Sequence, residues 1–176
     1  MDRVQDIANA IAALRPADKQ RLFRLLAEQG DLPPASPVAV QMPMPAQRAR
    51  PADYVLTFDG GSKGNPGFGY GSYAIVRVQD GARRIERLEF GDDYTNNEAE
   101  YDALIGGLRD LIGRIEEAGR KPQEFALEVR GDSALVINQL NGKWKVKEPR
   151  MRERRDECFR LLRRFGSVEL KAHPRE

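Results

Sequence analysis

The chain has 176 residues, with 29 lysines and arginines against 27 acidic residues and a net charge of +2. This length fits one domain of ordinary size with an appendage, and the balanced charge does not by itself indicate a nucleic-acid partner. The single cysteine, Cys158, excludes an internal disulfide and a cysteine zinc site, and it favours a reducing, cytoplasmic location. The single histidine, His173, excludes a multi-histidine metal site, and no apolar stretch is long enough to span a membrane.

The first 52 residues divide into a helical pair and a linker. Residues 1–30 carry apolar side chains at helical spacing on both sides of Pro16, which predicts a small helical hairpin. A hairpin of this size buries little surface alone, so we expect it to pack on the main domain, on a second copy or on a protein partner. Six of the residues in the segment 31–52 are proline, which predicts an extended linker.

Residues 53–176 are predicted to form the main domain. Short apolar runs bounded by turn residues predict five strands, at residues 53–60, 69–78, 83–90, 125–129 and 168–172. Apolar residues at helical spacing predict three helices, at residues 96–118, 132–141 and 148–165. The order β-β-β-α-β-α-α-β predicts an α/β domain with a mixed sheet covered by helices.

Acidic residues occur where the predicted elements begin or end. Asp59 follows the first apolar strand, where a carboxylate is costly unless a cation pairs with it, although Asp is also common in turns. Asp132 follows the fourth strand, where it also suits a helix N-cap. Glu98 and Glu100 both lie in the first turn of the long helix. Because Glu100 lies one turn before Leu104 on the apolar face, we assign Glu100 to the site and Glu98 to solvent.

Three segments together resemble the type 1 ribonuclease H family. They are the Asp-Gly-Gly-Ser-Lys-Gly-Asn run that begins at Asp59, the Thr-Asn-Asn-Glu-Ala-Glu run that begins at Thr95, and the Gly-Asp-Ser run that begins at Gly131. The resemblance covers residues 53–176 and implies the ribonuclease H fold, a five-stranded mixed sheet flanked by helices. It implies an endoribonuclease that hydrolyses the RNA strand of RNA–DNA hybrids and leaves 5′-phosphate ends. The catalytic and metal-binding residues that it implies are Asp59, Glu100 and Asp132.

The chemistry of these three residues agrees with the resemblance. Clustered carboxylates repel one another, so they either take up protons or bind cations. Hard oxygen ligands without histidine or cysteine favour Mg²⁺ or Mn²⁺. Two such ions about 3.5–4 Å apart activate a water molecule and stabilise the leaving oxygen of a phosphodiester, so no covalent intermediate is needed.

Contacts to the hybrid are expected from small turns, amide side chains and one basic aromatic segment. The substrate-binding residues that we predict are Gly60, Gly61, Ser62, Asn65, Asn96, Asn97, Lys143, Trp144 and Lys145. Other interpretations stay open: Asn96 also suits a helix N-cap, and Asn65 suits an ordinary turn. The segment 141–164 holds ten basic residues and four acidic ones, which is typical of a phosphate-binding track or of a solvated helix face.

The sequence departs from the family pattern in three places. Family members follow the last strand with a helix that carries a fourth acid, and the sequence stops at Glu176 before such a segment, so we expect the final helix to be missing. The connection from Asn141 to Glu148 is short, which indicates the subtype without the basic protrusion. His173 lies at the end of the last strand, and we interpret it as structural rather than as the mobile histidine of some members.

With three acids, activity is expected to fall, and two alternatives to the enzyme remain. The first is a non-catalytic hybrid-binding module of the same fold, and the second is a nuclease of this fold that acts on another duplex. Cleavage of a hybrid with Mg²⁺, with Mn²⁺ and with a chelator separates these alternatives.

Overall fold

The computed structural model describes Asp18 and residues 50–173. The predicted hairpin over 1–30, apart from Asp18, and most of the linker over 31–52 lie outside the described residues, so their partner contacts stay a prediction. Among the described residues, no helix has both the length and the apolar character that a membrane crossing requires.

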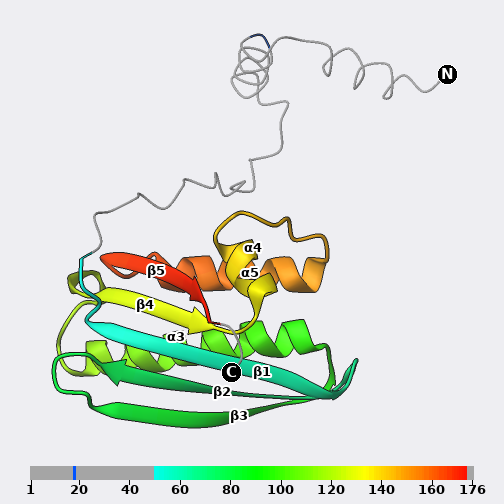
Figure 1. The fold of residues 1–176 in the computed structure, drawn as a ribbon, viewed down its shortest axis with the longest axis horizontal. Coiled ribbons are helices and arrows are strands. Elements are labelled where there is room, and N and C mark those ends of the chain that lie inside the picture. The colour runs from blue at the N-terminus through cyan, green and yellow to red at the C-terminus, as the bar shows by residue number, and fades with distance from the viewer. Residues whose placement is uncertain (1–17, 19–49, 174–176) are drawn as a thin grey trace. The chain divides into compact units, whose positions relative to one another are not determined.

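The main domain is built on one mixed sheet of five strands, shown in Figure 1. The strands are β1 (Tyr54–Gly64), β2 (Gly67–Arg77), β3 (Arg83–Tyr94), β4 (Ala126–Gly131) and β5 (Ser167–Ala172). Their order across the sheet is β3-β2-β1-β4-β5. The first three strands pair antiparallel, whereas β4 pairs in parallel with both β1 and β5. The predicted five-stranded mixed sheet is therefore confirmed.

Three α-helices and one 3₁₀ turn complete the domain. They are α3 (Asn96–Glu117), the turn η1 (Pro122–Glu124), α4 (Ala134–Leu140) and α5 (Pro149–Leu162). Helix α3 packs across β1 and β2, and α5 lies beside α3 (Figure 1). The predicted element order is confirmed in full, and the connection between α4 and α5 is short, as expected.

The core forms between the buried face of the sheet and the apolar stripe of α3. In β1, Leu56 and Phe58 are buried, while Thr57 and Asp59, which alternate with them, are exposed. This alternation turns one face of the strand toward α3. The apolar stripe of α3 is almost fully buried against that face, through Leu104, Leu108, Leu111, Ile112 and Ile115. This packing fixes the position of the first turn of α3 relative to the sheet, and Glu100 lies in that turn.

Several element ends, and the cap of α3, differ from the prediction. Strand β1 continues through the glycine-rich segment to Gly64, because the glycine backbones pair with β2, for example Gly60 with Gly71. The turn itself is confined to Asn65 and Pro66. Helix α3 takes Thr95 as its N-cap, so the interpretation of Asn96 as the cap is wrong. The Thr95 hydroxyl accepts a hydrogen bond from the Glu98 amide, which satisfies one of the free donors of the first turn.

Candidate active site

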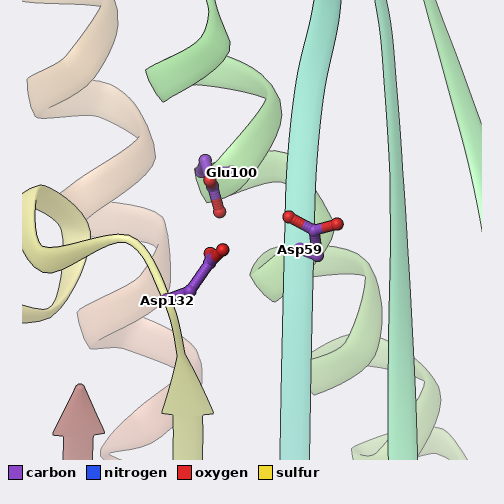
Figure 2. A group of neighbouring side chains, drawn as sticks. All are labelled: Asp59, Glu100 and Asp132. Carbon is purple, nitrogen blue, oxygen red and sulfur yellow. The ribbon is translucent and has the colours of Figure 1, made fainter. Parts of the chain in front are cut away.

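The three predicted acids come together at one edge of the central strands. Asp59 is on β1, Glu100 is in the first turn of α3, and Asp132 directly follows β4. One carboxylate oxygen from each residue lies within 4.8 Å of the other two. Figure 2 shows the three side chains turned toward one another. The structure thus brings the whole predicted set of carboxylates into one cluster.

The pairing of β1 with β4 explains why the two aspartates meet. The strands are parallel neighbours, and Phe58 is the register partner of Gly131. The residues that follow, Asp59 on β1 and Asp132 just after β4, therefore stand side by side at the same level. Sequence reasoning had only the common context of the two residues, an acid after an apolar strand.

Glu100 is held close to Asp59 by a contact between backbones. A Cβ atom on Gly60 would lie 2.4 Å from the carbonyl carbon of Ala99 and 2.5 Å from the amide nitrogen of Glu100. Only glycine allows β1 to come this near to the first turn of α3. Gly60 was predicted as a substrate contact, and the structure gives it a packing reason to be glycine.

The electrostatics of the cluster favour a cation. Two unit charges at this separation repel by about 3 kcal/mol at the effective dielectric constant of a protein near its surface. Glu100 is buried, and Asp59 is exposed, so the cluster is open to solvent on the β1 side. Three carboxylates without sulfur or imidazole ligands fit a hard divalent ion such as Mg²⁺ or Mn²⁺.

Several predicted substrate contacts form one chain of hydrogen bonds beside the acids. The Asn96 side-chain oxygen accepts from the Ser62 amide at 2.8 Å and from the Ser62 hydroxyl at 3.0 Å. The Asn65 side-chain oxygen accepts from the Asn96 amide at 3.2 Å. These bonds tie the β1–β2 hairpin to the start of α3. Asn65, Asn96 and Asn97 are exposed, whereas Gly61 is buried below Tyr70.

The predicted basic segment lies apart from this chain of hydrogen bonds. Lys143, Trp144 and Lys145 are in the connection between α4 and α5, and all three are exposed. Trp144 exposes 51% of its surface. An exposed indole between two lysines suits contact with a nucleic-acid strand.

His173 lies nearer to the acids than its predicted structural role suggests. A hollow of about 360 Å³ is lined by Asp59, Asp132 and His173, among others. The His173 amide donates to the Gly131 carbonyl at 2.8 Å, because β5 pairs in parallel with β4. The parallel pairing of the last two strands would have indicated this position, since Ala172 is the partner of Gly131.

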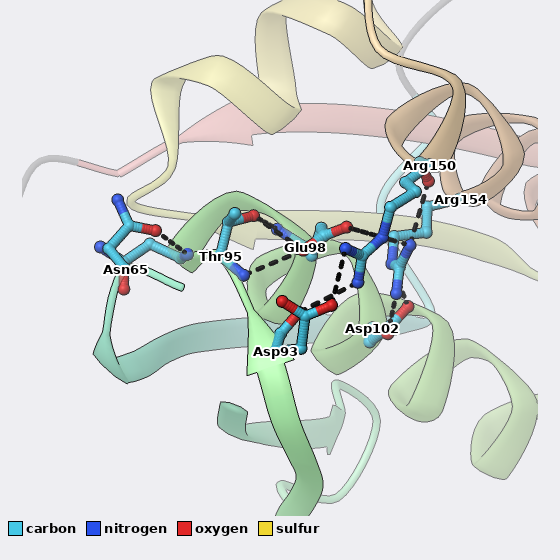
Figure 3. A network of polar contacts seen from close by, with 8 residues as sticks. Asn65, Asp93, Thr95, Glu98, Asp102, Arg150 and Arg154 are labelled. Carbon is cyan, nitrogen blue, oxygen red and sulfur yellow. Dashed lines mark hydrogen bonds and ion pairs between the residues drawn. The ribbon is translucent and has the colours of Figure 1, made fainter. Parts of the chain in front are cut away.

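Glu98 is buried, which contradicts its assignment to solvent. Only 3% of its surface is exposed. Its carboxylate accepts hydrogen bonds from the amide and the hydroxyl of Thr95, and it pairs with Arg150 of α5, as Figure 3 shows. The helical rotation was correct, but α5 covers the side of α3 that we expected to face water.

Comparisons with known proteins agree with this geometry. A family model described as reverse transcriptase-like matches residues 57–176. Ribonuclease HI of Halobacterium salinarum is 37% identical over 123 residues, which cover 67% of this chain and 55% of that protein. A bifunctional protein of Mycobacterium tuberculosis is 37% identical over 125 residues, which cover 69% of this chain and 31% of that protein. The chain therefore spans about half of the first relative and about a third of the second.

Solved structures give the same result. RNase H1 of the halophilic archaeon Halobacterium salinarum matches with a TM-score of 0.59 and 35% identity, over 69% of this chain and 86% of that chain. LC11-RNase H1, crystallised in complex with an RNA/DNA hybrid, matches with a TM-score of 0.60 and 30% identity, again over 69% and 86%. Both similarities extend over most of the described domain.

Proposed function

Because the chain belongs to the type 1 ribonuclease H family, we propose that it is an endoribonuclease that hydrolyses the RNA strand of RNA–DNA hybrids. The observation that carries the proposal is the cluster of Asp59, Glu100 and Asp132, whose carboxylate oxygens lie within 4.8 Å of one another. The relative crystallised with an RNA/DNA hybrid supports the choice of substrate. The expected products carry 5′-phosphate and 3′-hydroxyl ends.

We propose that the three carboxylates hold two Mg²⁺ ions, with Mn²⁺ as an effective substitute. Bound ions of this kind supply an activated water molecule and stabilise the charge on the leaving oxygen. The protein contributes the positions of the ligands: Asp59 and Asp132 from paired strands, and Glu100 from a helix that rests on β1. Because these elements are packed together, the ligands are already in place before substrate binds.

Recognition of the hybrid is proposed to use the two exposed groups described above. The amide side chains of Asn65, Asn96 and Asn97 are expected to face the minor groove, where they read the 2′-hydroxyl of the RNA strand. The basic segment of Lys143, Trp144 and Lys145 is expected to contact the backbone of the DNA strand. A reducing compartment such as the cytoplasm suits the lone, buried thiol of Cys158.

The test is cleavage of a hybrid labelled on both strands, with Mg²⁺, with Mn²⁺ and with a chelator. We expect metal-dependent cutting of the RNA strand, and Asp59→Asn should lower its rate by about 100-fold or more while the fold is kept. The matched control is Glu117→Gln, which makes the same carboxyl-to-amide change at an exposed position in the last turn of α3. The control should cut at the parent rate.

The other outcomes identify the alternatives. Cleavage by Asp59→Asn at the parent rate would show that the site is assigned to the wrong residues. Binding of the hybrid by the parent chain without cutting in either metal would identify a hybrid-binding module. Cutting of double-stranded RNA or DNA in preference to the hybrid would identify a nuclease with a different substrate.

A further inference from the structure

The carboxylate of Glu98 joins two elements that meet beside the site. One of its oxygens accepts from the Thr95 amide at 2.9 Å and from the Thr95 hydroxyl at 3.0 Å. The other lies 2.6 Å from Nε of Arg150, in the first turn of α5. A buried carboxylate is tolerated only when such partners replace its water. Glu98 therefore links the N-cap of α3 to the start of α5.

The side chains of Glu98 and Glu100 leave the first turn of α3 in different directions. The two residues are about 200° apart around the helix, so their side chains leave opposite sides of the same turn. Glu98 points toward α5, and Glu100 points toward Asp59 on β1 and Asp132 just after β4 (Figures 2 and 3). A turn that is held on both sides cannot rotate, and any movement of Glu98 is passed to Glu100 through two peptide units.

Arg150 extends the link to the end of β3. Its guanidinium donates to the Asp93 carbonyl at 3.0 Å and lies 3.3 Å from the Asp93 carboxylate. Asp93 has a φ of 66°, in the left-handed region, so the chain turns sharply there before it enters α3. One arginine thus contacts the segment before α3 and the first turn of α3 together.

The neighbouring arginine strengthens the same end of the helix pair. Arg154 makes a two-pronged contact with Asp102, at 3.0 and 3.1 Å, and its guanidinium lies over the Tyr94 ring at 5.4 Å. It also lies 3.6 Å from Glu98. The start of α5 therefore holds α3 through two arginines that are one helical turn apart.

Charge pairs occur along the whole contact between α3 and α5, and they differ in burial. From the site end onward they are Glu98 with Arg150, Asp102 with Arg154, Arg109 with Glu157, and Glu116 with Arg164. The acid is 4% exposed in the first pair and 48% exposed in the last. Arg150 itself is 52% exposed, but removing the partner of a buried carboxylate is costly, whereas pairs in which both groups are exposed contribute little. The strongest attachment therefore lies at the end of α3 that carries Glu100.

We propose that Glu98 and Arg150 are positioning residues for the metal ligand Glu100. The inference rests on the proposed function, because it deepens the assignment of Glu100 to that site. The pair keeps the first turn of α3 at a fixed distance from Asp59 and Asp132. Loss of the pair moves the Glu100 carboxylate and weakens the metal site, while the basic segment of Lys143, Trp144 and Lys145, which is not part of α3, keeps its contact with the hybrid.

The experiment compares Glu98→Gln, Arg150→Ala and the double variant with the parent chain. Glutamine keeps an oxygen for the Thr95 amide but cannot pair with Arg150 as an ion. We expect the Mn²⁺ dissociation constant, measured by calorimetry without substrate, to rise by about ten-fold in each single variant. The half-saturating Mg²⁺ concentration for cleavage should rise equally, and kcat should fall by more than KM for the hybrid rises, since Asn96 and Asn97 share the first turn of α3. The double variant should be no worse than the worse single variant, because both lose one interaction.

The chain offers a matched control and a conservative rescue. Glu116→Gln and Arg164→Ala remove the pair at the far end of α3, where Arg164 lies two residues after α5, and metal binding should be unaffected. Arg150→Lys keeps the cation and should restore part of the metal affinity. If Glu98→Gln and Arg150→Ala only lower the unfolding temperature while Mn²⁺ affinity and kcat stay at parent values, the pair is merely structural and the proposal is overturned. A raised KM at unchanged kcat would overturn it too, since Arg150 would then be a substrate contact.

Failure of the proposed function gives a different pattern. If the parent chain binds Mn²⁺ but cleaves no hybrid, the nuclease proposal fails, while the calorimetric comparison of the variants still decides the positioning role. If the parent binds no divalent ion at all, both proposals fail together.

Discussion

Replacement of Gly60 by alanine tests how the site is held together. The added methyl carbon would lie 2.4 Å from the Ala99 carbonyl carbon and 2.5 Å from both the Ala99 oxygen and the Glu100 nitrogen. All three are backbone atoms of α3, so no side-chain rotation relieves the contact. Ordinary van der Waals contact begins at 3.4 Å, so β1 and the first turn of α3 must separate by about 1 Å.

That separation should lower both the free energy of unfolding and the rate of cleavage. Overpacking of this kind costs about 1–3 kcal/mol of the free energy of unfolding, which urea titration measures. A misplacement of about 1 Å in a catalytic group lowers the rate by roughly 100-fold, which the labelled hybrid measures at saturating metal. We expect both effects in Gly60→Ala, since the moving part carries Glu100.

The matched control makes the same substitution inside α3. A Cβ atom on Gly113 meets nothing within 4 Å, and alanine is favoured over glycine in a helix interior by up to about 1 kcal/mol. Gly113→Ala should therefore unfold at higher urea and cleave at the parent rate. The reasoning is refuted if Gly60→Ala matches the parent in both stability and cleavage, because β1 and α3 would then not be in contact at this point.

Three further predictions concern other parts of the domain. Hydrogen bonds from Arg160, together with those from Arg109, lower the pKa of Glu157 to about 2 from its ordinary 4.5. The charged carboxylate thus stabilises the fold above pH 4.5 and the benefit is lost toward pH 2, so Glu157→Gln should flatten the fall in stability over that range in urea titrations. Burial raises the pKa of the Cys158 thiol, so a thiol reagent should label it only when urea unfolds the chain. Lys143→Ala with Lys145→Ala should lower the slope of log affinity for the hybrid against log salt by about two, whereas Lys121→Ala should leave it unchanged.

The fold was predictable from sequence where periodicity carries the information. Leu56 and Phe58 alternate with polar neighbours, and Leu104 and Leu108 recur at one helical turn, so both elements were placed correctly. The end of β1 was missed because glycines carry no side chain whose burial could show a period. Their pairing is decided by β2, which sequence reasoning does not position.

In the site, too, features that depend on local sequence were predictable, and features that depend on contacts between distant segments were not. Asp59, Glu100 and Asp132 were selected from their contexts, and they do form one cluster, while their catalytic role stays a prediction. Glu98 was placed in solvent because the rotation argument considered only the sheet, and the approach of α5 depends on contacts between distant segments. The place of His173 beside Asp132 was not predicted for a related reason, since it follows from the parallel pairing of β4 and β5, while its structural role stays a prediction.

The parallel pairing of β1 with β4 also bears on how the site comes into being during folding. Tyr54 pairs with Leu127, and β2, β3 and α3 lie between them in the sequence. The two aspartates therefore meet only after the chain has passed through these elements and returned to the sheet. Contacts between such distant residues form late, because loop closure must be completed before they stabilise anything. If the proposed site holds a divalent ion, the ion should bind the native chain and not the unfolded one, and at 100 times its dissociation constant it would add about 2.7 kcal/mol to the free energy of unfolding. Without a bound ion, the repulsion among the three acids would appear only at the last stage of folding.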